Sequence, residues 1–273
     1  MNKEDFFISL FDNSFLGDDG AVIDDIVVSK DLFCENIHFK REWMSLKEIA
    51  VKSMLVNISD AVVMNAKPRY ALIGIKLPKD ISFSEMKELK SGFEEICKEY
   101  DIKIIGGDTV SSDRLDISIT IISYSKKPIY RKGLKKGDMV AYTGNIGRCY
   151  KDLTKLLRGK KIYSKSKFIK PILRDKFFHQ ASKYMTTALD ISDGLSKDLS
   201  RLSKKNRVGF RFLKKLSKSK WCSGEEYEIL FSFKKRDRKK IVSLGKRYKT
   251  PINIFAIAKK GSYKSICREN HFR

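Results

Sequence analysis

Strand-like and helix-like patterns alternate through residues 22–124, and this order restricts the chain to folds in which helices cover a sheet. Two helices are expected, from Ser45 to about Ala66 and from Ser84 to Tyr100, because apolar residues recur in both at helical spacing. Ser45 and Glu48 form the capping-box pattern that starts a helix. The strand-like segments are residues 22–23, 26–29, 70–75, 103–105 and 115–124. This part is therefore predicted to be an α+β layer.

A lysine- and glycine-rich segment, Pro128 to Asp138, is the best candidate for a domain boundary. We predict an N-terminal domain of residues 1–130 and a shortened C-terminal α/β domain of residues 131–273. In the second domain, the expected strands are 139–143, 187–191, 228–233 and 252–257. The expected helices are about 150–157, 171–184, 194–203 and 236–248.

The charge balance is strongly basic, with 57 Lys+Arg against 33 Asp+Glu and a formal charge of +24. Such an excess permits binding of nucleic acid or of an anionic substrate, but a lysine-solvated surface is the simpler interpretation, and no specific nucleic acid is expected. The longest apolar stretches are too short to span a membrane. The opening residues MNKEDFF lack the basic and apolar run of a secretory signal. We therefore expect a soluble cytoplasmic protein.

Several common site patterns are missing. The five cysteines are odd in number, scattered and without a C-x-x-C pair, which indicates neither a disulfide framework nor a zinc site. The three histidines do not form H-E-x-x-H, and neither a P-loop nor a G-x-G-x-x-G pattern is present.

Aspartates stand beside glycine or serine in five clusters, most of them at expected strand ends. The clusters are GDDGA at 17–21, Asp31, NISDA at 57–61, GGDT at 106–109 and DISDG at 190–194. Taken singly, each is more often a turn or a helix cap, but Asp60 lies in an apolar helix, where a lone carboxylate is costly unless paired or metal-bound. Gathered carboxylates need cations, and oxygen ligands suit magnesium. Together with glycine-rich loops they indicate magnesium, phosphates and nucleotide chemistry.

The order of these clusters resembles the thiamine-monophosphate kinase family, part of the ATP-binding superfamily that includes aminoimidazole ribonucleotide synthetase and selenophosphate synthetase. The resemblance runs from Gly17 to Ile257. It rests on GDDGA (17–21), SKDLFCENIHF (29–39), KSMLVNISDAVVMNAKP (52–68), IIGGDT (104–109), RKGLKKGDMVAYTGNIG (131–147), LDISDGLSKDL (189–199) and SGEEYEILF (223–231).

The resemblance implies a fold and an activity. The fold would be the two-domain α/β fold of aminoimidazole ribonucleotide synthetase, with the N-terminal sheet forming a barrel at a dimer interface. The activity would be direct in-line transfer of the γ-phosphoryl group of ATP to thiamine monophosphate, with Mg²⁺ as cofactor. The expected partners are these two substrates and a second copy of the chain.

Residue by residue, the resemblance implies three groups of functional positions. The magnesium ligands would be Asp19, Ser29, Lys30, Asp31, Asp60, Asp108, Asp190 and Asp193. The ATP contacts would be Gly107, Asp108, Arg131 and Ser192, with Arg131 clamping a phosphate. His38 and Glu225 would face thiamine monophosphate. No covalent intermediate is expected, so catalysis would consist of positioning and charge neutralisation.

Several positions depart from the family pattern. Lys30 stands where the family usually has a metal-binding threonine, so this ligand is either lost or replaced by the main-chain carbonyl. Asn65 replaces a glycine, and SGEE at 223–226 replaces GGED. The aromatic residue that stacks on the substrate is not identified by the alignment of motifs; the candidates are Trp221, Tyr263 and Phe272.

Three alternatives stay open from the sequence. The chain could be another ATP-using enzyme of the superfamily, although no cysteine precedes Cys34, which argues against selenophosphate synthesis. It could be a basic nucleic-acid-binding protein, whose affinity would fall steeply with salt. It could also be a noncatalytic relative that binds nucleotide only, an alternative best supported by Lys30.

Overall fold

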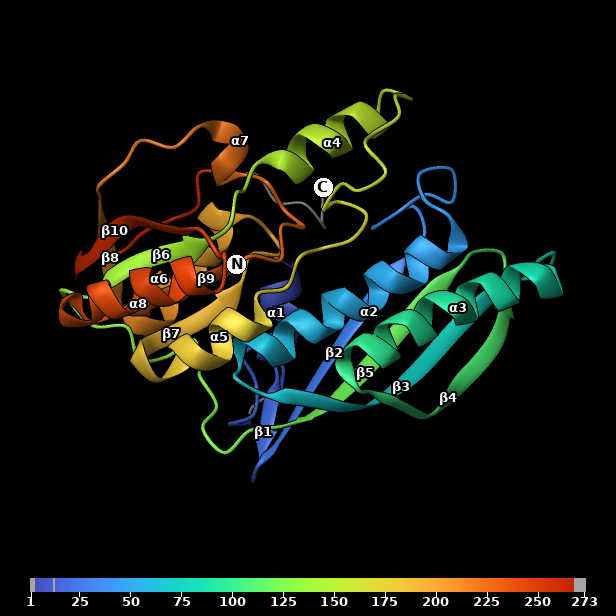
Figure 1. Cartoon of the computed structure of the whole chain (residues 1–273), viewed down its shortest axis with the longest axis horizontal. Helices are drawn as coiled ribbons and strands as arrows, with labels where there is room; N and C mark the ends of the chain where they lie inside the picture. Colours follow the sequence, from blue (N-terminus) through green and yellow to red (C-terminus); the bar gives the residue numbers. More distant parts are fainter. Residues whose placement is uncertain (1–2, 12, 268–273) are drawn as a thin grey trace.

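The computed structural model contains two five-stranded sheets. The long helix α2 (Leu46–Val63) packs on the first sheet and reaches β7 (Met185–Asp190) of the second (Figure 1). It describes residues 3–11 and 13–267. None of the helices in these ranges is long and apolar enough to cross a membrane. The cytoplasmic location and the domain boundary after residue 130 stay predictions.

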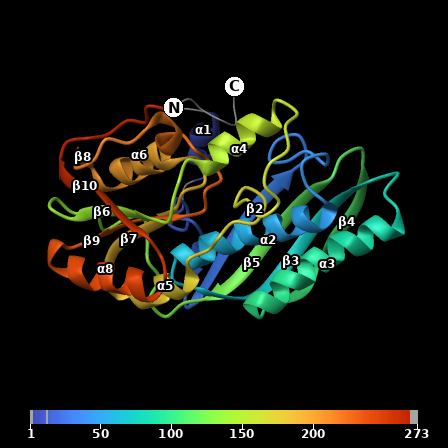
Figure 2. The same cartoon turned by 45° about the horizontal axis from the view of Figure 1, so that its top comes forward.

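The first sheet has the strand order β1-β2-β5-β3-β4, and only the β3–β4 pair is parallel. Its strands are β1 (Ala21–Ile23), β2 (Ile26–Cys34), β3 (Lys67–Pro78), β4 (Lys103–Ser112) and β5 (Asp116–Tyr124). The parallel pair is joined by α3 (Phe83–Tyr100), as a parallel connection requires a crossover. Helices α2 and α3 cover one face of this sheet (Figure 2). The predicted order of strands and helices is confirmed.

Helix α2 forms where the sequence predicts it. Ser45 and Glu48 make both bonds of the capping box. Nearly every position of the helix is buried, because it packs against the sheet, α3 and the second half of the chain. After the helix, Asn65 adopts φ +57°, a conformation that asparagine tolerates better than most residues. The departure from the family glycine therefore keeps the turn.

The second sheet has the order β7-β9-β6-β10-β8 and is covered on both faces. Its strands are β6 (Met139–Thr143), β7 (Met185–Asp190), β8 (Val208–Phe212), β9 (Ile229–Phe233) and β10 (Ile252–Lys260). The helices around it are α4 (Arg148–Leu156), α5 (Asp175–Ala181), α6 (Leu195–Asn206), α7 (Lys218–Trp221) and α8 (Arg238–Arg247). Alternate residues of β6 and β9 enter different cores, as the two-residue period of a strand requires.

Several sequence predictions need correction. Strand β8, helix α7 and the N-terminal helix α1 (Lys3–Ser9) were not expected. The helix predicted over 171–184 is reduced to α5 and a 3₁₀ turn, because residues 158–174 form an irregular segment that packs on α2 and α3. Asp31 and Asp108 do not stand at strand ends: β2 and β4 continue past them, held by pairing with β5 and β3.

The expectation about cysteines also needs correction, because Cys222 and Cys267 form a disulfide. The two residues lie 45 positions apart, and their approach depends on the segment after β10, whose backbone bonds to Ser196 and Ser203 of α6. Sequence spacing alone does not reveal such a long-range approach. Trp221 and Tyr263 lie in the aromatic core of this region, and Phe272 lies outside the described residues.

Candidate active site

Three carboxylates from distant parts of the chain meet between the two sheets. They are Asp19 from the loop before β1, Asp60 from the last turn of α2 and Asp190 from the end of β7. Each offers an oxygen within 4.8 Å of the others. The Ser59 hydroxyl donates to Asp190 Oδ2 at 2.6 Å and so fixes this carboxylate against α2. We call Asp19, Asp60 and Asp190 the acidic triad.

Burial and mutual repulsion disfavour the charged forms of these carboxylates. Burial, followed by the charge of Asp19, raises the pKa of Asp190 to about 7 and that of Asp31 to about 6. Burial and then the charges of Asp31 and Asp190 raise the pKa of Asp60 well above its usual value. A cation bound among these carboxylates would stabilise their charged forms and lower their pKa values. An all-oxygen donor set of this kind fits a hard divalent cation such as magnesium.

Arg131 supplies the positive charge next to the triad. Its guanidinium donates to both carboxylate oxygens of Asp19, from Nη2 at 2.7 Å and from Nε at 3.1 Å. Its backbone N–H donates to Asp18 at 2.5 Å. The predicted phosphate clamp therefore lies beside the triad, paired with one of its members.

Asp31 and Ser29 lie on the face of β2 that α2 covers. The side-chain oxygen of Asn57 accepts from the Asp31 backbone N–H at 2.8 Å, and the Ser29 hydroxyl donates to the Asn57 carbonyl at 3.4 Å. These bonds join β2 to the helix that carries Asp60. Both predicted ligands are therefore placed beside the triad.

Three predicted metal ligands do not join the triad. The Lys30 side chain is exposed on the opposite face of β2 and donates to the Ser118 hydroxyl, because consecutive strand residues face opposite sides; only its main-chain carbonyl stays a candidate ligand. The Asp193 carboxylate pairs instead with Lys197 and Arg201 of α6. Asp108 is exposed on the edge strand β4.

The distance from Asp108 to the triad follows from the sheet order. Strands β5 and β3 separate β4 from β2, and three strand spacings amount to about 14 Å. Gly107 lies beside Asp108, with φ +152°, and a Cβ there would lie 1.8 Å from the Ile73 carbonyl oxygen. The backbone of β4 therefore requires glycine at this point, but one chain does not bring Gly107 and Asp108 to the other predicted site residues.

The two residues predicted to face the acceptor are joined by two side chains that sequence reasoning missed. His38 accepts from the Cys34 N–H at 3.0 Å and stacks on Phe33, with ring centroids 5.6 Å apart. Lys52 lies over the same Phe33 ring, and its Nζ is 2.8 Å from Glu225 Oε2. The Glu225 backbone N–H donates to the Ser192 carbonyl at 2.7 Å, which links this side to the end of β7.

A sequence signal for these missed residues exists in α2. Lys52 interrupts the apolar run AVKSML, where a lysine has no solvent to reach, and Asn57 and Ser59 accompany Asp60. A polar residue inside such a run requires a buried partner. The partners themselves come from other elements, so the sequence does not identify them.

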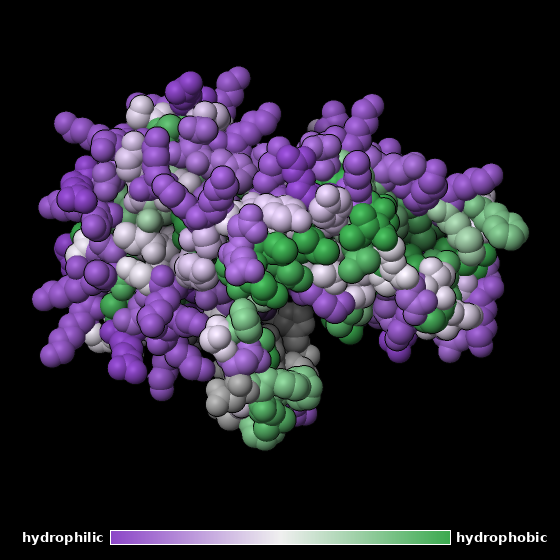
Figure 3. Space-filling view, turned by 90° about the horizontal axis from the view of Figure 1, so that it is seen from below, coloured by the Kyte–Doolittle hydropathy of each residue, from purple (hydrophilic) through white to green (hydrophobic). Residues whose placement is uncertain are grey.

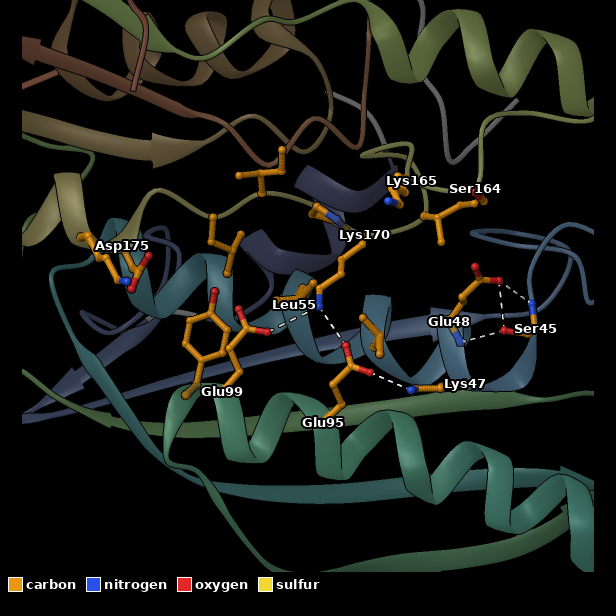
Figure 4. A pocket seen from close by; sticks show the side chains of 17 residues that line it. Ser45, Lys47, Glu48, Leu55, Glu95, Glu99, Ser164, Lys165, Lys170 and Asp175 are labelled. Carbon is orange, nitrogen blue, oxygen red and sulfur yellow. Dashed lines mark hydrogen bonds and ion pairs between the residues drawn. The ribbon is translucent and has the colours of Figure 1, made fainter. Parts of the chain in front are cut away.

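A cavity of about 840 Å³ lies elsewhere, between α2, α3 and the segment 164–176 (Figure 4). Lys170 lies in it within 2.9 Å of Glu95 and 3.5 Å of Glu99, and Lys47 pairs with Glu95 at 2.9 Å. No residue of the acidic triad or of the acceptor side lines it. The cavity is therefore not part of the candidate site.

Comparisons with known proteins agree with this arrangement. Residues 17–124 match the family "AIR synthase related protein, N-terminal domain". A solved structure, "AaThiL complexed with AMPPCP and TMP", superposes with a TM-score of 0.87 at 22% identity, covering 99% of this chain and 96% of that one. A structure of thiamine monophosphate kinase from Aquifex aeolicus superposes with a TM-score of 0.82 at 21% identity, covering 97% of each chain. These matches show the fold.

Curated relatives extend the likeness to the sequence. The thiamine-monophosphate kinase of Buchnera aphidicola subsp. Schizaphis graminum (strain Sg) is 33% identical over 258 residues, which cover 83% of this chain and 78% of the relative. That of Nitrosopumilus maritimus (strain SCM1) is 30% identical over 247 residues, covering 83% and 79%. The chain belongs to the thiamine-monophosphate kinase family.

Proposed function

We propose that this chain transfers the γ-phosphoryl group of ATP to the phosphate of thiamine monophosphate, giving thiamine diphosphate and ADP. The observation that carries this proposal is the acidic triad between the two sheets, beside Arg131, in a member of this family. Both reactants are polyanions, so the reaction needs them held close together with their charge neutralised. A buried group of carboxylates that favours cations suits that task.

Magnesium is the cation that we propose for this site, held by the acidic triad with Asp31 beside it. When bound, magnesium neutralises phosphate charge and orients the reacting oxygens. The chain's own residues then have defined tasks. Ser59 and Asn57 hold Asp190 and the Asp31 backbone in place, and Arg131 presents its guanidinium to the phosphates. We place His38, Ser192 and Glu225 as the resemblance does: Ser192 on ATP, and His38 and Glu225 on the acceptor.

We further propose a homodimer in which the first sheets of two copies form a barrel. On the face of this sheet opposite α2, one chain exposes the apolar side chains of Leu32 and Leu72, and the edge strand β4 exposes Ile104, Ile105 and Val110. Figure 3 shows apolar patches interrupting an otherwise hydrophilic surface when the molecule is seen from below. Covering such a face removes apolar area from water.

The proposed dimer also gives Gly107 and Asp108 a role. They lie on the exposed edge strand β4, about 14 Å across the sheet from β2. In a barrel, β4 of one copy approaches strands of the other copy. We propose that Asp108 completes the site of the second copy.

The experiment that tests the function measures ADP release and thiamine diphosphate formation with ATP and magnesium. Thiamine monophosphate should stimulate both, and unphosphorylated thiamine should stimulate neither, because an alcohol carries no charge for site cations to hold. ATP turnover with a different acceptor would identify another enzyme of the superfamily. ATP binding without turnover would favour a noncatalytic relative, and tight, sequence-selective RNA or DNA binding that ATP does not displace would favour the nucleic-acid alternative.

A further inference from the structure

Lys52 is a fully buried lysine in a chain whose many other lysines are mostly at the surface. Its side chain is 0% exposed, and its Nζ lies 2.8 Å from Glu225 Oε2 and 3.9 Å from the centroid of the Phe168 ring. The Phe33 ring lies 5.7 Å away on another side. A buried ammonium needs a partner charge, and aromatic faces add favourable interactions. Glu225 supplies the charge, and the two rings complete the surroundings of Nζ.

Glu225 is held in an unusual conformation by contacts at both ends. Its backbone has φ +55°, a region that glutamate rarely adopts, and its N–H donates to the Ser192 carbonyl. Its side chain is 22% exposed, and Lys52 holds only Oε2. Among the described residues, Oε1 accepts no hydrogen bond and so is available to a ligand.

Lys52 and Glu225 belong to different parts of the chain. They are separated by 173 positions: Lys52 lies in α2, which packs on the first sheet, and Glu225 lies in the loop that leads to β9 of the second. Phe168 comes from a third part, the irregular segment between α4 and α5. The ammonium group therefore joins three parts of the molecule next to the acceptor side.

We propose that Lys52 is a positioning residue for the acceptor: it fixes one oxygen of Glu225 so that the other meets thiamine monophosphate in a defined orientation. This inference rests on the proposed acceptor role of Glu225. Direct contact between Lys52 and a substrate phosphate does not fit the structure, because Nζ is enclosed by Glu225, Phe33 and Phe168.

Steady-state kinetics of Lys52→Met and Glu225→Gln test the inference, since each replacement keeps size and removes charge. Lys52→Met should raise the KM for thiamine monophosphate about tenfold, the scale of a lost hydrogen bond to a charged group. The kcat and the KM for ATP should change by less than about twofold. The double variant should be no worse than the worse single variant, whereas independent effects would multiply.

Lys167→Met is the matched control. Lys167 is also nearly buried and pairs with Glu226 at 2.5 Å and Glu228 at 3.5 Å, one residue and three residues beyond Glu225. Its loss should lower the melting temperature as much as Lys52→Met does while leaving the KM for thiamine monophosphate almost unchanged. If Lys52→Met does not fold, Phe168→Leu removes the ring beneath Nζ and should raise the same KM about threefold.

The outcomes separate this inference from the proposed function. Equal KM changes in Lys52→Met and Lys167→Met would reduce Lys52 to a structural role. A collapse of kcat in Lys52→Met at unchanged KM would mean that Lys52 acts on the transferred phosphate, and positioning would be wrong. A normal KM in Glu225→Gln would remove the acceptor role of Glu225 and the inference with it. A raised KM in Glu225→Gln but not in Lys52→Met would overturn the inference alone.

Discussion

Two groups of buried charged side chains lie between the two halves of the chain, and they differ in how their charges are balanced. The acidic triad gathers like charges, with Arg131 bound to one member. Burial, together with the neighbouring carboxylate charges, raises the pKa values of Asp60 and Asp190. The other group, which we call the paired network, balances each carboxylate internally: Lys52 with Glu225, Lys167 with Glu226 and Glu228, and Arg174 with Glu228. The first group is incomplete without added cations, and the second is complete.

The triad is therefore suited to binding cations, whereas the paired network mainly holds the structure together, apart from the second carboxylate oxygen of Glu225. In the paired network each charge has its partner in the chain, so the loops and helix start that it joins are ordered before any ligand arrives. Glu226, for example, accepts from the backbone N–H groups of Gly147 and Cys149 at the start of α4. The triad keeps its carboxylates together only because the fold forces them together. A substitution in the triad should therefore abolish activity and raise stability, whereas a substitution in the paired network should lower stability.

The largest effect is expected for Asp60→Asn. The amide keeps the size of the side chain but removes the charge that would hold cations beside the phosphates, so phosphoryl transfer should fall below detection. Because one of several repelling carboxylates is removed, the melting temperature of the metal-free protein at neutral pH should rise. Substantial turnover in folded Asp60→Asn protein would contradict the metal assignment.

Co-expression of Asp60→Asn and Asp108→Asn chains tests whether the two residues act in different copies. Each variant alone should be inactive. If Asp108 serves the site of the second copy, mixed dimers contain one intact site, and the preparation should recover about a quarter of wild-type activity. No recovery from demonstrated mixed dimers would place Asp108 in its own chain's site, and full activity of Asp108→Asn alone would place it outside any site.

A smaller effect, on stability alone, is expected for Arg174→Met in the paired network. Arg174 donates from Nε and Nη2 to Glu228, whose side chain is 1% exposed. Leaving a buried carboxylate short of a partner should lower the free energy of unfolding by about 3 kcal/mol in urea titrations. The partly exposed pair of Arg41 and Glu85 is the control, and Arg41→Met should lower the free energy of unfolding far less, because solvent screens this pair. Similar losses in both variants would show that Glu228 is not held as described.

The sequence predicted the arrangement of local elements better than the contacts between them. The period of apolar residues and the capping box located α2, and the family motifs named the residues that form the triad. Contacts between distant segments could not be predicted from the sequence. The partners of the Lys52–Glu225 pair are 173 positions apart, and those of the Cys222–Cys267 disulfide are 45 positions apart. The prediction of Lys30 as a metal ligand failed for its side chain, because Lys30 is adjacent to Asp31 in β2 and therefore faces the opposite side of the sheet.

The contrast between the two groups makes a definite prediction for metal-free protein as pH rises. The folded-state pKa values of Asp31 and Asp190, about 6 and about 7, lie above the ordinary aspartate value of 3.8. Between the ordinary value and these values the folded state binds more protons than the unfolded state, so stability falls as pH rises. Because a group is only half ionised at its own pKa, the part of the loss that comes from Asp190 continues beyond pH 7.

The melting temperature, measured at pH 5.5 and 7.5 with and without magnesium, tests this contrast most directly. Without magnesium, the wild-type protein should melt several degrees lower at pH 7.5 than at pH 5.5, and magnesium should restore the loss at pH 7.5 because it binds the folded state. Asp60→Asn should show a smaller fall and little response to magnesium, whereas Lys167→Met should keep the wild-type response from a lower starting temperature. A wild-type melting temperature that magnesium does not change at pH 7.5 would contradict the account of the acidic triad as a cation site.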